Sequence, residues 1–174
     1  MICLIRCIFD GISVFNVIHN NIVKYTTQTR CKVCLVGDFN ALTGLKTEFT
    51  DINDYVLNSV QLDDVINIVN LDTLCIDVTH YNLDLSLNNY GNRLLQMYQS
   101  LELLTANGRL GRDQGVGALT CKNTTVVGYC ILSPELFACV SEFEVLDPIT
   151  LKFYANLLVL FNMMVLTWMS QVYM

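Results

Sequence analysis

The segment KVCLVGDFN, residues 32–40, decides how the rest of the chain is interpreted. Its apolar run VCLV, bounded by Gly37, is typical of a strand that is buried on both faces of a sheet. Along an extended segment Asp38 and Asn40 point to one side, and Phe39 points to the other side, into the core. The sequence therefore predicts a buried strand that carries two polar side chains at its carboxyl end.

Two amphipathic helices are predicted on either side of this strand. Apolar residues recur at helical spacing over about residues 13–26 and again over about residues 91–101. The first helix is expected to pack on the strand that follows it. The side chains of the two apolar faces are Phe15, Ile18, Ile22 and Tyr25 in the first helix, and Leu94, Met97, Tyr98 and Leu101 in the second.

The remaining sequence predicts further strands and turns. The run LLTANGR is typical of a strand that enters a turn, GALTCKNTTVVGYCILS of a hairpin around KNTT, and EFEVL of a last strand. The sequence SPE at residues 133–135 predicts an N-cap and a brief helix over about 134–140. Residues 45–89 predict a long irregular connection with one helical stretch near 55–69. The glycines of NGRLGRDQGVG are interpreted as turn residues, because the stretch lacks the Lys-Ser/Thr ending of a phosphate-binding loop.

The composition fits one folded domain. The chain has 174 residues, of which 53% are hydrophobic and 15% are charged, and its mean hydropathy is +0.44. These values exclude intrinsic disorder. The formal net charge of −6, from 10 Lys and Arg against 16 Asp and Glu, provides no general positive field for a nucleic-acid backbone.

The cysteines indicate a reducing compartment. The chain has 8 of them, mostly in apolar runs, which favours buried thiols, and no disulfide partner is expected. The CxxC pair, Cys31 and Cys34, lies at the start of the predicted strand, so its side chains would point to opposite faces and bind zinc poorly. Neighbouring aspartates in the irregular connection are interpreted as solvated carboxylates rather than as a metal site.

The C-terminal stretch differs from the rest of the chain. From residue 153 onward it contains no charged residue, and a helix of this length would span roughly 33 Å, enough for a bilayer core. Two asparagines within the span weaken its insertion. We therefore divide the chain into a domain over residues 1–150 and a hydrophobic tail over residues 151–174, which forms either a membrane helix or a buried helix.

Three motifs occur in an order that is typical of a known family. They are GDFNALTG at residues 37–44, GNRLLQMYQSLELLTANGRLGRDQGVGALTC at 91–121 and VVGYCILSPELFACVSEFEVLDP at 126–148. With these motifs the chain resembles the endonuclease/exonuclease/phosphatase family, and within it the apurinic-type endonuclease domain of LINE-like (non-LTR) retrotransposons. The resemblance covers roughly residues 13–148. It implies a fold of the α/β class, a four-layer α/β sandwich in which two β-sheets pack face to face with helices outside, here incomplete at both ends.

The resemblance also implies a chemistry. Members of this family cut phosphodiester bonds with a divalent metal, Mg or Mn, and the partner would be DNA. By motif position Asp38 would orient or activate the attacking water and Asn40 would contact the scissile phosphate, roles that suit a carboxylate and an amide. Asn107 and Arg109 of the NGR motif would bind the substrate. The alternative is that Asp38 and Asn40 cap a turn after the strand, and that Arg109 lies in a solvated turn.

Several positions depart from the family pattern. Gly128 stands where the family has the aspartate that steadies its catalytic histidine. The segment ITLKFYANLL follows Asp147-Pro148, where the family has Ser-Asp-His. The early asparagine and the metal-binding glutamate of the family have no counterpart in these 174 residues. His19 and His80 match no family position and are expected at the surface.

These departures predict a partial metal-dependent phosphodiesterase or endonuclease domain of retrotransposon origin that is catalytically impaired. General acid–base groups each contribute roughly 10²–10⁴-fold to a rate, and a bound metal adds further stabilisation of charge. The alternative function is a non-enzymatic scaffold or a tail-anchored, membrane-associated protein. A soluble chain would be nuclear or cytoplasmic, and an inserted tail would place it at a membrane.

Overall fold

The computed structural model describes the larger part of the chain. For residues 2–8, 156 and 164–168 the structure describes the backbone alone. The helical stretch that the sequence predicts near residues 55–69 lies outside the described residues. The described residues are 2–8, 13–46, 48, 71, 73–77, 79–121, 124–146, 156–161 and 164–168.

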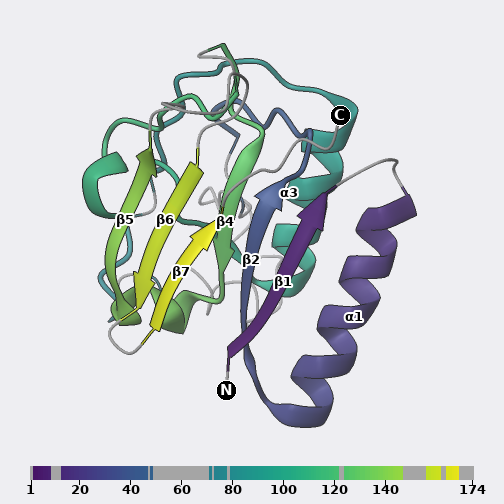
Figure 1. Cartoon of the computed structure of the whole chain (residues 1–174). Helices are drawn as coiled ribbons and strands as arrows, with labels where there is room; N and C mark the ends of the chain where they lie inside the picture. Colours follow the sequence, from purple (N-terminus) through teal and green to yellow (C-terminus); the bar gives the residue numbers. More distant parts are fainter. Residues whose placement is uncertain are drawn as a thin grey trace, which may run out of the picture.

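A four-stranded mixed sheet forms the centre of the molecule (Figure 1). Its order is β1 (Ile2–Ile8), β2 (Lys32–Asp38), β4 (Gly128–Leu132) and β3 (Leu104–Thr105). β1 is parallel to β2, whereas β4 is antiparallel to both β2 and β3. The strand predicted around VCLV is confirmed as β2, and the strand of LLTANGR is confirmed as the short β3. β1 is an additional strand, beyond those that the sequence predicts.

The second sheet is antiparallel and includes part of the C-terminal stretch. β5 (Val140–Leu146), β6 (Asn156–Phe161) and β7 (Met164–Trp168) lie in this order. The strand predicted from EFEVL is confirmed within β5. A 3₁₀ helix, η1 (Gly111–Asp113), packs against β5. The helix predicted for residues 151–174 is wrong where the structure describes this stretch, because β6 and β7 are strands.

The packing of β6 explains this difference. Leu157, Val159 and Phe161 are buried, whereas the leucines between them are partly exposed. This period of two residues is typical of a strand, but all five side chains are apolar, so the sequence shows no alternation that would separate a strand from a helix. β6 shares a core with the first sheet, so the boundary predicted after residue 150 does not separate it from the preceding domain. Among the described residues, no helix is long and apolar enough to cross a membrane.

Two helices cover one face of the first sheet (Figure 1). α1 spans Ser13–Thr29 and α3 spans Asn89–Leu101, so both predicted helices are confirmed with small shifts of their ends. Tyr25 is exposed, contrary to the face predicted for α1. The buried residues that the helices share with one cluster of the sheet include Phe15, Ile18, Ile22, Leu94, Met97 and Tyr98.

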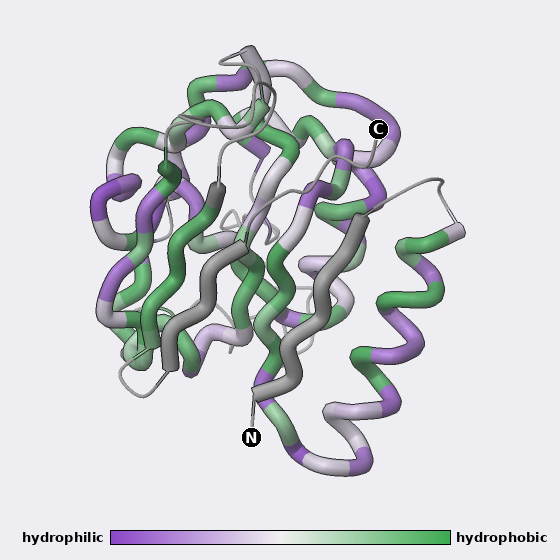
Figure 2. The backbone as a smooth tube through the Cα atoms, in the orientation of Figure 1, coloured by the Kyte–Doolittle hydropathy of each residue, from purple (hydrophilic) through white to green (hydrophobic). Residues whose placement is uncertain are grey.

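The strands β2 and β4 separate two hydrophobic clusters. Val33 and Leu35 of β2 pack in the cluster beneath the helices, while Cys34 and Val36 pack in a second cluster with Phe143 of β5. Both faces of β2 are therefore buried, which explains its continuous apolar run. Figure 2 shows that β2 and β4 are hydrophobic along most of their length. The described fold is a mixed α+β structure with a helical layer and two sheets.

Two further predictions, for the segments that precede and follow β4, differ from the structure. Pro134–Cys139 form a 3₁₀ helix, η2, and Ser133 makes no side-chain cap to it. The Ser133 hydroxyl instead accepts a hydrogen bond from Val33 N at 2.9 Å, which ties the start of η2 to β2. In the predicted hairpin around KNTT, an isolated bridge between Cys121 and Thr125 takes the place of a first strand.

Candidate functional site

The two predicted catalytic residues lie at the carboxyl end of β2. Asp38 is the last residue of β2 and stands in register with Gly128 of β4. Phe39 is fully buried and packs edge to face on Tyr129, with ring centroids 6.2 Å apart. The Phe39 N–H donates to Val127 O at 2.8 Å. The prediction that Phe39 points into the core is confirmed.

Asn40 turns the chain away from the sheet. Its φ of 50° is left-handed, and its N–H donates to Asp38 Oδ1 at 2.9 Å, which is an Asx turn. The extended geometry predicted for Asp38 and Asn40 therefore ends before Asn40, and the turn of the alternative interpretation is present. Asp38 is half-buried. Burial raises the pKa of its carboxyl, and the hydrogen bond from Asn40 opposes that rise.

Asn88 fixes the loop after β2 to the start of α3. It is the N-cap of α3 and accepts a hydrogen bond from Gly91 N at 2.7 Å. Its Oδ1 also accepts from Leu42 N at 3.1 Å, and its amide donates to Asn40 O at 2.9 Å. A helix cap thus sets the backbone position at Asn40. Asn88 is missing from the predicted site residues, although an asparagine directly before an amphipathic helix is an N-cap signal.

The residue in register with Asp38 supplies no carboxylate, because it is Gly128. A Cβ at Gly128 would lie 3.3 Å from both Cβ and Oγ1 of Thr120. The Thr120 hydroxyl accepts hydrogen bonds from Val127 N at 2.9 Å and from Gly128 N at 2.8 Å. Thr120 therefore fills the space beside Gly128 and holds the start of β4 in place.

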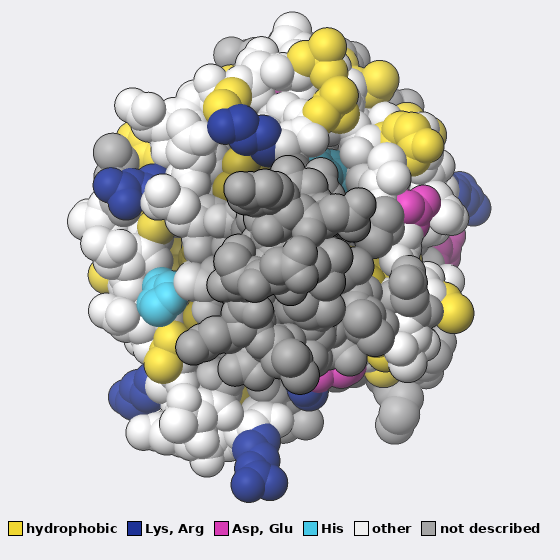
Figure 3. All heavy atoms as spheres, turned by 180° about the vertical axis from the view of Figure 1, so that it is seen from behind, with side chains coloured by type: hydrophobic (Ala, Val, Ile, Leu, Met, Phe, Trp, Pro, Cys, Tyr) yellow, Lys and Arg dark blue, Asp and Glu magenta, His cyan; other side chains and the backbone are white. Residues whose placement is uncertain are grey.

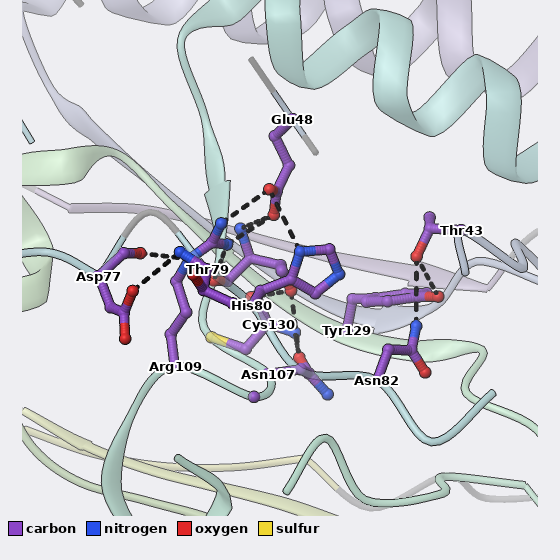
Figure 4. Close-up of polar contacts among 12 residues, drawn as sticks. Thr43, Glu48, Asp77, Thr79, His80, Asn82, Asn107, Arg109, Tyr129 and Cys130 are labelled. Atoms are coloured by element: carbon purple, nitrogen blue, oxygen red, sulfur yellow. Dashed lines mark hydrogen bonds and ion pairs between the residues drawn. The ribbon is translucent and has the colours of Figure 1, made fainter. Parts of the chain in front are cut away.

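Asn107 lies within the first sheet. It is buried, and its amide donates to Gly128 O at 3.2 Å. Its Oδ1 accepts from Cys130 N at 2.9 Å (Figure 4). These two bonds bind the backbone of β4 on the side of β3. The Asn107 side chain is thus bonded to the backbone of Gly128, the residue of β4 that stands in register with Asp38. Contact between Asn107 and a substrate stays a prediction.

Arg109 forms a buried ion pair with Glu48 (Figure 4). Its Nη1 lies 2.7 Å from Glu48 Oε1 and its Nη2 lies 2.9 Å from Glu48 Oε2. Arg109 Nε also donates to Asp77 O at 2.9 Å. Arg109 is 3% exposed and Glu48 is 2% exposed, so the alternative expectation that Arg109 lies in a solvated turn is wrong. Contact between Arg109 and a substrate stays a prediction.

The ion pair keeps Glu48 ionised. Burial alone would raise the pKa of its carboxyl, but the hydrogen bonds and the charge of Arg109 outweigh burial, so the pKa of Glu48 lies below its usual value. The Thr105 N–H adds a further hydrogen bond to Glu48 Oε1 at 3.1 Å. Glu48 is absent from the predicted site residues, because no local spacing in the sequence connects it with Arg109.

His80 completes this cluster. Its Nδ1 lies 3.6 Å from Glu48 Oε2 (Figure 4). His80 is buried, so the prediction of a surface residue is wrong, whereas His19 on α1 is partly exposed. Burial lowers the pKa of His80, and the neighbouring Glu48 only partly offsets this effect. The cluster of Glu48, Arg109 and His80 therefore combines a charged pair with an imidazole whose pKa lies below its usual value.

The donors at the end of β2 do not fit a dedicated Mg²⁺ or Mn²⁺ site. Mg²⁺ requires near-octahedral oxygen ligands, usually with one or two carboxylates and the phosphates of a substrate. Asp38 offers one carboxylate, whose Oδ1 already accepts from Asn40 N, and the residue beside it is Gly128. In the part of the chain that the structure describes, no three His, Cys, Asp or Glu side chains gather to hold a metal ion. No catalytic step through a metal follows from this arrangement.

Comparison with known protein families, with curated proteins and with solved structures finds no match for this chain.

Proposed function

We propose that this chain is a partial phosphodiesterase or endonuclease domain of retrotransposon origin, related to the endonuclease/exonuclease/phosphatase family, with impaired catalysis. The observation that carries the proposal is the end of β2, where Asp38 and the exposed Asn40 leave the sheet in the order of the GDFN motif. The substrate class would be DNA. The helical layer and the two sheets with a shared core support a four-layer α/β sandwich as the finer fold.

The residues at this position can perform part of a phosphodiester cleavage. A carboxylate such as Asp38 can orient a water molecule, and an amide such as Asn40 can donate to a phosphate oxygen. The impairment follows from two sequence positions, Gly128 and the segment after Pro148, which lack the aspartate and the histidine of the family pattern. Because each acid–base group contributes roughly 10²–10⁴-fold to a rate, we expect turnover close to the uncatalysed background.

The test combines cleavage and binding with purified protein. Nicking of supercoiled plasmid and of a duplex with one abasic site is measured in Mg²⁺ and in Mn²⁺, and binding of the same duplex is measured by fluorescence anisotropy. We expect almost no nicking, and binding that Asn40→Ala weakens more than the control Asn89→Ala on α3. Strong metal-dependent nicking that is lost in Asp38→Ala would refute the impairment. Wild-type protein without measurable binding, or equal binding by the two variants, would refute the phosphodiester site.

A non-enzymatic scaffold is the second candidate function. The observation that favours it is the internal bonding of Asn107 and Arg109, whose polar groups bind β4 and Glu48. The described part of the tail forms β6 and β7, which favours a scaffold over a tail anchor. A scaffold would show cooperative urea unfolding together with no measurable duplex binding. Release of the chain from membranes by alkaline extraction separates the scaffold from the anchor, because an anchored chain would stay in the membrane pellet.

A further inference from the structure

Residues 81–87, with the sequence YNLDLSL, reverse the usual distribution of polar and apolar side chains. Their four apolar side chains are 40% to 72% exposed, while two polar side chains between them are buried. Leucine is normally among the most buried residue types, and asparagine and aspartate are normally exposed. The exposed residues are Tyr81, Leu83, Leu85 and Leu87, and the buried residues are Asn82 and Asp84.

The buried polar side chains hold this reversal in place. Asn82 Nδ2 donates to Gly44 O at 3.0 Å, and Asn82 Oδ1 accepts from Asp84 N at 2.9 Å. The Asp84 carboxylate accepts from Ser86 N at 2.9 Å and from Val126 N at 3.2 Å. Turning the segment over would break all four bonds and leave buried donors and acceptors without partners. The hydrogen bonds of Asn82 and Asp84 therefore keep the leucine side chains directed toward the solvent.

Two glycines support the same segment from the NGRLGRDQGVG loop. A Cβ at Gly108 or at Gly117 would lie 2.1 Å from Tyr81 O, so only glycine permits this approach. Leu83 N donates to Gly117 O at 3.0 Å. The loop thus fixes the backbone at Tyr81 and Leu83 while their side chains remain exposed. This surface is organised before any partner binds.

Two neighbouring segments extend the exposed apolar surface. Leu45 follows Gly44, which lies against the Leu85 carbonyl, and Val116 precedes Gly117. Both Leu45 and Val116 are exposed. We name the resulting surface the apolar ridge, and its six side chains are Leu45, Tyr81, Leu83, Leu85, Leu87 and Val116.

The apolar ridge lies at the end of the molecule to which β2 points. In Figure 1 the teal chain that precedes α3 passes over the tip of β2, and in the opposite view of Figure 3 hydrophobic side chains gather at the same end. Hydrogen bonds connect the two places, because Asn88 follows the ridge and binds Asn40 O. The ridge is therefore a neighbour of the candidate site.

We infer that the apolar ridge docks on the surface of a lipid bilayer. Within residues 44–46, 81–87 and 115–117, Lys46 is the exposed charged side chain, and Asp84 is buried. Leucine and valine side chains can enter the acyl boundary, tyrosine suits the headgroup level, and a lysine can reach a lipid phosphate. A nucleic acid would require several cations at this surface, whereas the chain carries a net charge of −6.

The extent of the ridge favours a bilayer over a second copy of the chain. Six side chains that are 40% to 72% exposed present on the order of 600 Å², less than the ~800 Å² per partner of a standard protein interface. Insertion into a bilayer interface requires no matching protein surface, and a few apolar side chains suffice for reversible binding.

The test measures binding of the full chain to sonicated phosphatidylcholine vesicles by co-sedimentation. The variant Leu83→Ser/Leu85→Ser removes the most exposed part of the segment. Its matched control is Val17→Ser/Val23→Ser on α1, which also removes two exposed apolar side chains. We expect the ridge variant to reduce the vesicle partition coefficient at least tenfold and the α1 variant to leave it within about twofold. Circular dichroism of both variants establishes that they fold.

The outcomes separate the bilayer from other partners. Wild-type protein that does not bind the vesicles, or equal binding by the two variants, would overturn the inference. Sedimentation velocity without vesicles provides the second reading, because self-association that the ridge variant abolishes would assign the ridge to a second copy. None of these readings depends on phosphodiester cleavage or on Asp38, so the inference and the proposed function can fail separately.

Discussion

Arg109 and Glu48 form a bidentate ion pair inside the protein, with nitrogen-to-oxygen distances of 2.7 and 2.9 Å. The pair joins the loop after β3 to the chain that follows β2, 61 residues away in sequence. His80 lies beside it, with Nδ1 3.6 Å from Glu48 Oε2. Three irregular segments are thus held together by charge and hydrogen bonds, next to Thr105 of β3, whose N–H also donates to Glu48.

Replacing Arg109 by methionine should lower the free energy of unfolding by about 3–5 kcal/mol, because the Glu48 carboxylate would stay buried without its counter-charge. Urea unfolding measures this loss. Arg112 provides the control, since it is exposed and its partners Glu142 and Glu144 lie 3.6 and 3.1 Å away at the surface. Arg112→Met should cost less than about 1 kcal/mol. Equal losses of unfolding free energy in the two variants would show that the buried ion pair contributes no more to stability than the exposed one.

The stability of the protein should decrease as the pH falls from about 7 to about 5.5. Burial lowers the pKa of His80 in the folded state, so below the ordinary value of about 6.5 the unfolded chain binds the proton more readily. The stabilisation is complete above that value and is lost as the pH falls toward the pKa of the folded state. Glu48, with a pKa below its usual value, contributes a further loss at more acidic pH.

Urea midpoints at a series of pH values measure this dependence. His80→Gln should flatten the curve between about pH 7 and pH 5.5, because the titrating group is removed. His19→Gln on the partly exposed face of α1 should leave the curve unchanged. A dependence that persists in His80→Gln would assign the effect to other groups.

The elements that the sequence predicts well are those with a local pattern. α1 and α3 follow from apolar residues at helical spacing, and β2 follows from a short apolar run that ends at a glycine. Phe39 could be placed in the core because the strand continues as far as Asp38. Asn40 could not be placed, since its left-handed φ of 50° begins a turn that the strand pattern does not encode.

The remaining features depend on contacts between distant segments. β6 is apolar at every position from Leu157 to Phe161, so its period is visible only in the burial of the folded chain. The burial of His80 and Arg109 depends on Glu48, which arrives from a different part of the sequence. Tertiary pairing of this kind leaves no spacing along the chain, so the sequence places His80 at the surface and assigns Arg109 either to a substrate or to a solvated turn.

Gly117→Ala should destabilise the protein by at least about 3 kcal/mol. A Cβ at this position would lie 2.1 Å from Tyr81 O, and the φ of +65° disfavours any side chain. Gly115→Ala tests the conformational part alone, because Gly115 has a φ of +75° but open space around its Cβ position. It should cost about 1–2 kcal/mol. Thermal unfolding distinguishes the two, and similar costs would mean that the loop can move away from Tyr81.

Asn107→Ala should lower stability whether or not a substrate is present. The change leaves Gly128 O and Cys130 N without their side-chain partner in a buried sheet, at a cost of about 1–3 kcal/mol for each unsatisfied group. Asn92 on the exposed surface of α3 is the matched control, and Asn92→Ala should change stability by less than about 0.5 kcal/mol. Unchanged stability of Asn107→Ala would instead leave substrate contact as the role of this residue.

Asn88→Ala should loosen the candidate site from a position outside it. The variant removes the N-cap bond to Gly91 N and the bonds to Leu42 N and Asn40 O, so it should cost about 2–3 kcal/mol and speed hydrogen exchange at the Leu42 amide. Asn89→Ala, one residue along at the exposed start of α3, should do neither. If Asn40 contacts phosphate, Asn88→Ala should also weaken duplex binding, because the backbone at Asn40 would lose its anchor. Slow exchange of the Leu42 amide in Asn88→Ala would show that the loop keeps its position without this anchor.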